Sequence, residues 1–206
     1  IREVVAMRPF ESRPQRGISL VEVLVTMLIL AIGLLGLVGL QARLQILQME
    51  AYQRAQALML LKDMSSRIAN NRNDADAYIT GTTGLDAPLG AGMTCPAADP
   101  SENRHAADAR EWCNALQGAG ESLNGSRVGS MVGGRGCVED VGPGAYLVTV
   151  AWQGLAPISA SAPPASVACG LNQYNGGAGS VCTLDRCRRA VTTLVIIPDL
   201  LGFGSS

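Results

Sequence analysis

Hydrophobic and polar positions divide this chain sharply near its start. Residues 18–40 form a run in which only Ser19, Glu22 and Thr26 are polar. About 20 apolar residues suffice to cross a bilayer as a helix. The run therefore predicts a membrane-spanning helix in which Glu22 is the only ionisable side chain. An acid at membrane depth is costly, and it is a functional candidate by default.

Basic residues gather on one side of this run. The next basic residue after it is Arg43, whereas four arginines precede it: Arg2, Arg8, Arg13 and Arg16. This asymmetry predicts that the N-terminal end stays in the cytoplasm and that the rest of the chain lies across the membrane. A secretory signal has its small-residue cleavage site after the apolar run, but here Gly17 comes before it. Cleavage at Gly17 would remove a basic leader, residues 1–17, and leave the apolar helix on the product.

Helical character continues past the apolar run. Residues 41–71 contain no Gly or Pro and are rich in good helix formers. Spacings of three and four predict one buried face, made of Leu47, Ala51, Ala55, Leu58, Leu61, Ser65 and Ile68. Most polar residues fall off that face: Arg43, Gln48, Glu50, Gln53, Arg54, Lys62 and Asp63. Residues 18–71 thus predict one continuous helix, here called the spine, of roughly 80 Å. Residues 72–206 must cover its buried face.

Period-two alternation appears late in the chain. Residues 145–153 place Tyr146, Val148, Val150 and Trp152 on one face, and residues 189–197 are rich in strand formers up to Pro198. These segments predict two antiparallel strands. A third strand at 136–141, with 127–132 as a further candidate, completes a small sheet that covers the spine. The expected fold is α+β: a long N-terminal helix packed on a small antiparallel sheet with disulfide-tied loops.

A second helix is predicted between the spine and the sheet. Residues 72–99 are mostly turn formers with one short ordered piece at 77–80. Asp99 offers a helix cap with Pro100 and Glu102 after it, and Gly118 closes residues 103–117. Trp112 and Leu116 lie four apart on one face of this helix. Trp112 is interpreted as a core residue, with a ligand platform as the alternative.

Composition argues against catalysis and nucleic-acid binding. The formal net charge is −1, it becomes −3 without the leader, and there is no basic patch. The only histidine, His105, lies in no recognisable motif and is expected to be solvent-exposed. The acids show no paired spacing, and no glycine-rich loop follows a strand. We therefore expect no enzymatic activity, no cofactor and no metal.

Six cysteines follow the apolar run: Cys95, Cys113, Cys137, Cys169, Cys182 and Cys187. An even number in an oxidising compartment predicts three disulfides. A zinc site is a poor alternative, because zinc sites commonly use close Cys-x-x-Cys pairs or histidines. Six cysteines allow fifteen pairings, and the expected one is Cys95–Cys113, Cys169–Cys187 and Cys137–Cys182. A glycine-rich region with few aromatics needs such crosslinks, each worth about 2–4 kcal/mol.

The junction Gly17-Ile18-Ser19-Leu20-Val21-Glu22 resembles that of type IV pilins and type II secretion pseudopilins. Residues 29–37, and more weakly the Asp108, Trp112 and Leu116 spacing, resemble PilV minor pilins. The resemblance is close over residues 16–71. It implies that a prepilin peptidase cuts between Gly17 and Ile18 and that Ile18 is N-methylated. Ile18 stands where Phe or Met is more usual, and Met7 is a candidate true start.

Glu22 and three glycines each have two interpretations. Glu22 could cap the helix start locally, or neutralise the new amino terminus of an adjacent subunit, which is the role the family implies. The second is favoured, because a cap alone does not need an acid at membrane depth. Gly33, Gly36 and Gly39 allow close helix packing in lipid, or mark a segment poised to unwind when the subunit leaves the bilayer.

The resemblance implies a structural role: a minor pilin that helps to prime type IV pilus assembly and supports twitching motility and adhesion. Implied partners are the prepilin peptidase, other minor pilins, the major pilin and an inner-membrane assembly platform. The implied location is the inner membrane, single-pass with the C-terminal region in the periplasm, and then the extracellular pilus. The alternatives are a type II secretion pseudopilin and a tip-located adhesive subunit whose loops at 81–100 and 157–182 bind a surface.

Overall fold

The structure is a computed structural model that describes residues 17, 19–80, 88–120, 122–123, 126–127, 129, 131–158, 162–164 and 166–198. The leader prediction, Ile18 and part of the 81–100 loop therefore lie outside the described residues. The chain forms two compact units that divide between Gln45 and Ile46, and each is treated by itself below.

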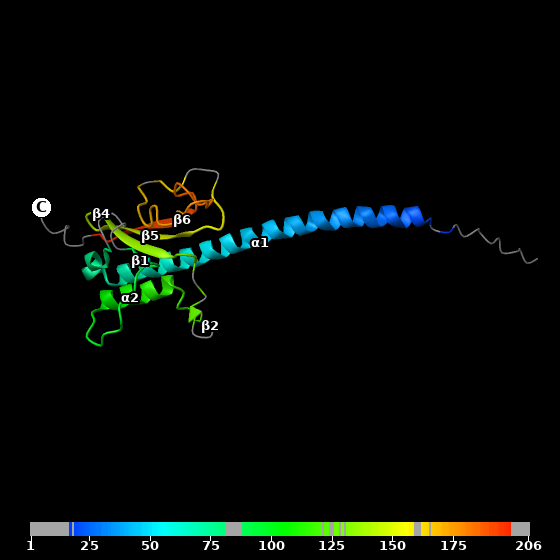
Figure 1. Ribbon diagram of the computed structural model, residues 1–206. Coiled ribbons are helices and arrows are strands. Elements are labelled where there is room, and N and C mark those ends of the chain that lie inside the picture. The colour runs from blue at the N-terminus through cyan, green and yellow to red at the C-terminus, as the bar shows by residue number, and fades with distance from the viewer. Residues whose placement is uncertain are drawn as a thin grey trace, which may run out of the picture. The chain divides into compact units, whose positions relative to one another are not determined.

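Helix α1 (Leu20–Asn70) is the predicted spine, unbroken over 51 residues (Figure 1). It ends where the sequence turns to Asn and Asp, and the short 3₁₀ helix η1 (Arg72–Tyr78) follows. In the N-terminal unit α1 is the only described element, whereas its last part belongs to the core of the C-terminal unit.

The main sheet has four antiparallel strands in the order β1-β4-β5-β6. Strands β4 (Arg135–Gly142), β5 (Ala145–Gln153) and β6 (Arg188–Ile196) confirm the three predicted strands. Strand β1 (Leu89–Gly90) was not predicted and pairs only with Gly136 and Arg135. Of the candidate strand at 127–132, the described residue Arg127 belongs to β3 (Ser126–Arg127), which pairs with β2 (Ser122–Leu123) in a separate two-stranded sheet.

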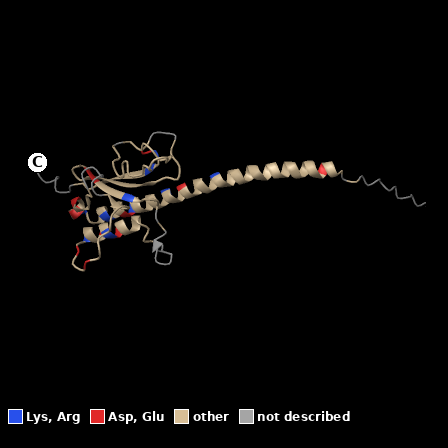
Figure 2. Cartoon of the chain, viewed as in Figure 1, with Lys and Arg blue, Asp and Glu red and all other residues tan. Residues whose placement is uncertain are grey.

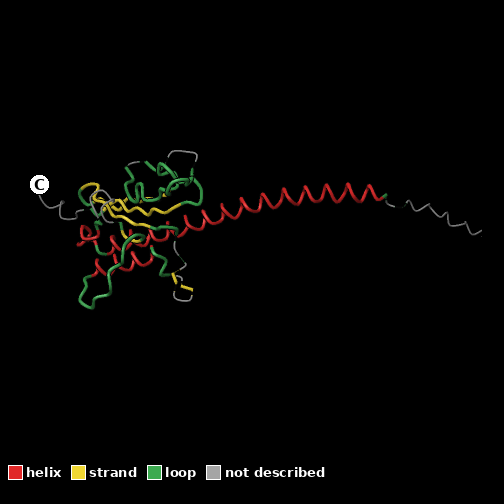
Figure 3. Tube along the Cα trace, in the orientation of Figure 1, coloured by secondary structure: helices red, strands yellow, loops and turns green. Residues whose placement is uncertain are grey.

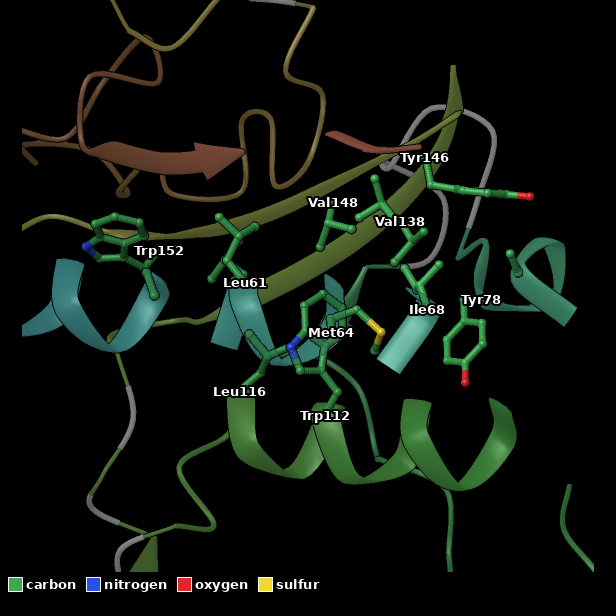
Figure 4. Packing of buried hydrophobic residues seen from close by; sticks show 14 of the residues in the cluster. Leu61, Met64, Ile68, Tyr78, Trp112, Leu116, Val138, Tyr146, Val148 and Trp152 are labelled. Carbon is green, nitrogen blue, oxygen red and sulfur yellow. The ribbon is translucent and has the colours of Figure 1, made fainter. Parts of the chain in front are cut away.

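In the C-terminal unit, α1 lies between the sheet and helix α2 (Arg104–Leu116). Figure 4 shows Leu61, Met64 and Ile68 of α1 in one buried cluster with side chains of the sheet and of α2. The labelled members include Val138 and Val148 of the sheet and Trp112 and Leu116 of α2. The sheet contributes the side chains predicted on one face of β5, and Figure 3 shows its strands running alongside this part of α1. Trp112 is fully buried and its indole nitrogen donates to the Leu60 carbonyl at 3.0 Å, so Trp112 is a core residue and not a ligand platform.

The predicted buried face of the spine is wrong in its first half. Leu47, Ala51, Ala55 and Leu58 are exposed, while Leu61 and Ile68 are buried as expected. The residues that face the core are Gln53, Ala57, Leu61, Met64 and Ile68. Residues 44–60 carry apolar side chains all round the helix, so the sequence does not fix which side is covered. Gln53, predicted to lie off the buried face, is in fact part of it.

The cap predicted at Asp99 is wrong, because helix α2 starts four residues later, with Asn103 at the cap position and Arg104 as its first residue. Asp99 instead holds the preceding turn, where its carboxylate accepts from the backbone and side chain of Ser101. Gly118 closes the helix at φ +83°, a conformation that favours glycine. The prediction that His105 is solvent-exposed is wrong: it is half-buried and packs edge-on against Tyr78, with ring centroids 6.3 Å apart.

Three disulfides use all six cysteines. Cys95–Cys113 joins the loop to α2, as predicted. The other two predicted pairs are wrong, because the structure pairs Cys137 with Cys169 and Cys182 with Cys187. Cys137 lies on β4 and packs with Ala151 of β5 and Tyr174, in a small second core that Cys169 also joins. The Cys137–Cys169 bond therefore fastens the long β5–β6 connection onto the sheet.

Candidate membrane and assembly segment

The apolar segment begins at an orderly helix start. The carbonyl of Ser19 accepts from the backbone nitrogens of Glu22 at 3.0 Å and Val23 at 3.3 Å. Leu20 is therefore the first helical residue, and Glu22 lies in the first turn. A carboxylate there is favoured by the positive end of the helix dipole. Gly17 is exposed next to this start, whereas Ile18, on the other side of the expected scissile bond, lies outside the described residues.

From Leu20 to Leu40 the helix shows its apolar side chains to the surroundings. Their exposed fractions run from 43% at Val23 to 79% at Leu20. An 18-residue window of α1 is apolar and long enough to cross a membrane, and none of that window is buried. Figure 2 shows this stretch free of charge apart from the acid in its first turn. Such a surface is stable in a bilayer or against other apolar helices, and it is unfavourable in water.

The three glycines of the apolar segment are open. A Cβ added at Gly33, Gly36 or Gly39 would meet nothing within 4 Å, and α1 is continuous through all three. The chain itself therefore does not require glycine at these positions. Close approach of another helix and local unwinding both remain predictions.

In the C-terminal unit, a polar cluster joins the end of α1 to α2. Arg67 donates to Asp63 at 2.9 Å, to Asp108 at 2.6 Å and to Glu111 at 2.8 Å. The Tyr78 hydroxyl donates to the second oxygen of Asp108 at 2.6 Å. Asp108 is buried, and these two donors make its burial tolerable. The sequence singled out Asp108 only by its spacing to Trp112 and gave no signal for Arg67.

A second buried charge holds the β5–β6 connection. Arg188 is fully buried and donates to the carboxylate of Asp185 and to the carbonyls of Val167, Cys169 and Pro163. Asp185 also accepts from the backbone nitrogen of Asn172 at 3.1 Å. Sequence reasoning missed both residues. The available signal was a cluster of charges at residues 185–189, where every residue but Cys187 is charged, after a stretch, residues 154–184, that contains no Asp, Glu, Lys or Arg.

Two buried tyrosines give this unit a pH dependence. Burial, together with a hydrogen bond to Asp108, raises the pKa of Tyr78 to about 12. Burial and a hydrogen bond to Asp76 raise the pKa of Tyr146 to about 12. The ordinary tyrosine pKa is 10.0, so the folded state holds these protons more tightly than the unfolded state. Stability contributed in this way is complete below pH 10 and is lost as pH rises from about 10 to about 12.

We expect the free energy of unfolding of the C-terminal unit to fall over that pH range, and Tyr78→Phe to make the fall shallower. The phenylalanine variant has one fewer proton to lose on unfolding. Chemical denaturation at several pH values with the disulfides intact measures both slopes. Tyr52→Phe, on the exposed side of α1, is the control. Equal slopes in the Tyr78→Phe variant and the unchanged chain would contradict the prediction.

The described residues offer no cluster of three or more His, Cys, Asp or Glu side chains that could hold a metal ion. A groove of about 570 Å³ lies in the C-terminal unit between α1 and the start of β6. Its walls are mostly apolar, and its charged residues are Glu50, Arg54, Arg188 and Arg189. Nothing in it resembles a catalytic arrangement of nucleophile, base and oxyanion donors.

Residues 12–38 match a family model described as the prokaryotic N-terminal methylation motif. The chain carries a prepilin-type N-terminal methylation motif. This motif, the exposed apolar helix and the α+β fold together support a type IV pilin-like or pseudopilin-like protein, a class whose members are typically structural subunits. No curated protein and no solved structure matches this prepilin-type chain.

Proposed function

We propose that this prepilin-type chain is a minor pilin of a type IV pilus, of the PilV type, which helps to prime assembly and supports twitching motility and adhesion. The observation that carries the proposal is the methylation motif at the start of a 51-residue helix with an exposed apolar surface. A subunit of a fibre needs such a helix twice, first as a membrane anchor and then as a packing surface. The chain acts as a substrate of processing and as a building unit, without catalysis of its own.

In this proposal a prepilin peptidase cuts between Gly17 and Ile18 and Ile18 becomes N-methylated. Glu22 then lies close to the new cationic amine of a neighbouring subunit. The C-terminal unit lies in the periplasm while the subunit is anchored in the inner membrane, and later on the pilus surface. Its three disulfides fit an oxidising compartment. Other minor pilins, the major pilin and the assembly platform are the partners.

The type II secretion pseudopilin is the second candidate, because the same motif serves both machines. A clean deletion strain separates them when sheared surface pili and secreted type II substrates are measured side by side. Loss of pili with normal secretion supports the minor pilin. Normal pili with blocked secretion would replace it by the pseudopilin. If both are normal, the adhesive role of the loops becomes the function to test.

A further inference from the structure

The outer edge of β6 offers unpaired backbone groups. Gly154 donates to the Cys187 carbonyl at 2.7 Å, and Ile197 donates to the Gly144 carbonyl at 2.7 Å. The β5–β6 register between these points is regular. In an antiparallel pair, residues alternate between facing the partner strand and facing away. The odd-numbered residues of β6 therefore face β5, and the backbone groups that point outward belong to Ala190, Thr192, Leu194 and Ile196.

No described residue makes a hydrogen bond to these outward groups. The opposite edge of the sheet differs. There the Gly134 carbonyl accepts from Ala91 at 2.8 Å, Gly136 pairs with Leu89, and Val138 bonds to Thr80 through both its N–H and its carbonyl. One edge of the sheet is thus covered by short segments over residues 134–138, while the other remains open within the described chain.

The sequence of β6 does not protect this edge. Charged side chains and proline are two devices by which edge strands commonly prevent pairing with another chain. Residues 190–196 contain neither. Leu194 is 51% exposed and Ile196 is 66% exposed. A regular, uncharged edge with exposed apolar side chains is a template for an added strand, with backbone hydrogen bonds giving affinity and alternate side chains giving specificity.

The first part of this edge runs into the groove beside α1. Ala190 and Val191 line it together with Arg54 and Trp152. Arg189 is neutralised by Glu50 at 3.0 Å and Arg188 by Asp185, but Arg54 has no partner among the described residues. The buried indole N–H of Trp152 is also without one. The groove therefore favours a segment that carries an acidic group at this end.

The direction of β6 argues against a symmetric pair of copies. The strand begins beside Glu50 of α1, and Val195 near its end pairs with Tyr146, whose hydroxyl donates to Asp76 of η1, just after α1 ends. Thus β6 and α1 run the same way within this unit. An antiparallel β6–β6 pair would set the α1 helices of the two copies in opposite directions. The two chains would leave such a pair at opposite ends toward their N-termini, which favours an occupant other than a second copy.

We propose that the outer edge of β6, residues 190–196, binds an extended segment of a different pilin-like subunit, which adds to the sheet as a fifth strand. The segment is uncharged over its central residues and carries an acidic side chain that pairs with Arg54. This inference rests on the proposed role as a fibre subunit and names the surface through which the C-terminal unit is held to a neighbour.

Thr192→Pro tests the proposal, because it removes an outward N–H while leaving the β5 ladder intact, and edge strands tolerate proline. Incorporation of the variant into sheared pili should fall about tenfold, since at least one hydrogen bond and the close approach of the added strand are lost. Thr192→Val keeps the backbone donor and should incorporate normally. Arg54→Glu should also reduce incorporation. Unfolding curves with intact disulfides establish that the variants fold, and Thr192→Lys replaces Thr192→Pro if the proline variant does not.

A photoreactive phenylalanine derivative in the full chain in cells identifies the occupant. At position 192 it should join the chain to another protein with a prepilin-type leader, and at the exposed control position Val132 it should not. Crosslinks only to a second copy, equal crosslinking at both positions, or normal incorporation of folded Thr192→Pro and Thr192→Lys would each overturn the proposal. If deletion abolishes pili while these edge variants assemble normally, the docking edge is wrong and the proposed function stands.

Discussion

Glu22→Gln is expected to leave the subunit in the membrane, cut at Gly17 and folded, yet almost absent from pili. Glutamine serves a capping box as well as glutamate does, so the local helix start is kept and only the negative charge is removed. Loss of one partner from a buried ion pair costs about 3–5 kcal/mol, and about 1.4 kcal/mol is a factor of ten. We therefore expect incorporation to fall by a factor of about a hundred or more. Immunoblots of sheared pili against the membrane fraction measure it.

Two matched variants sharpen this experiment. Glu22→Asp keeps the charge on a shorter side chain and should retain more incorporation than Glu22→Gln. Thr26→Val, one turn further along the same helix, removes a polar group without charge and should behave as the unchanged chain does. Mass measurement of the N-terminus shows whether each variant is processed. If processed Glu22→Gln assembles normally, the intermolecular role of the charge is wrong and Glu22 is a local cap.

Arg188→Met is expected to destabilise the C-terminal unit by about 3–5 kcal/mol, because it leaves the buried Asp185 carboxylate without its cation. The carbonyls of Val167, Cys169 and Pro163 would also lose their donor. Chemical denaturation of the oxidised full chain in detergent, followed by the fluorescence of Trp112 and Trp152, measures the change.

Arg189→Met is the matched control for that variant. It is the next residue and the same substitution, but its ion pair with Glu50 is partly solvated, with side chains 17% and 29% exposed. Such a pair is worth about 0–1 kcal/mol. Equal losses of stability in the two variants would show that Arg188 contributes nothing beyond an ordinary surface arginine.

The elements predicted best are those with a strong local period. Helix α1 could be predicted from an apolar run long enough to span a membrane, followed by residues 41–71, which are rich in helix formers and contain no Gly or Pro. Strand β5 could be predicted from its strict alternation of side chains. The covered side of α1 was not readable, since apolar residues such as Leu47 and Leu58 occur all round the helix and the position of the sheet selects Gln53 instead. Arg188 and Asp185 are only three positions apart, but the carbonyls to which Arg188 donates come from residues about twenty positions earlier. No local pattern signals them.

The candidate site divides in the same way. Gly17, the start of α1 and the position of Glu22 follow from a short motif whose chemistry is local. The polar cluster around Asp108 and the open edge of β6 depend on which elements meet in space, so they needed the structure. The incorrect disulfide pairs have the same cause: Cys137 meets Cys169 because both lie over the face of the sheet that is turned away from α1.

The observed disulfides have a consequence for biogenesis. The six cysteines are bonded as three consecutive pairs along the chain: Cys95 to Cys113, Cys137 to Cys169 and Cys182 to Cys187. A chain that crosses the membrane from its N-terminus exposes these thiols in that same order. An oxidase that joins cysteines as they emerge therefore produces the native bonds directly, with no need for an isomerase to reshuffle them. In the predicted pairing, by contrast, Cys137–Cys182 and Cys169–Cys187 interleave along the chain. An oxidase that joins cysteines in their order of emergence would first form Cys137–Cys169, and that bond would have to be broken to reach the predicted pairing.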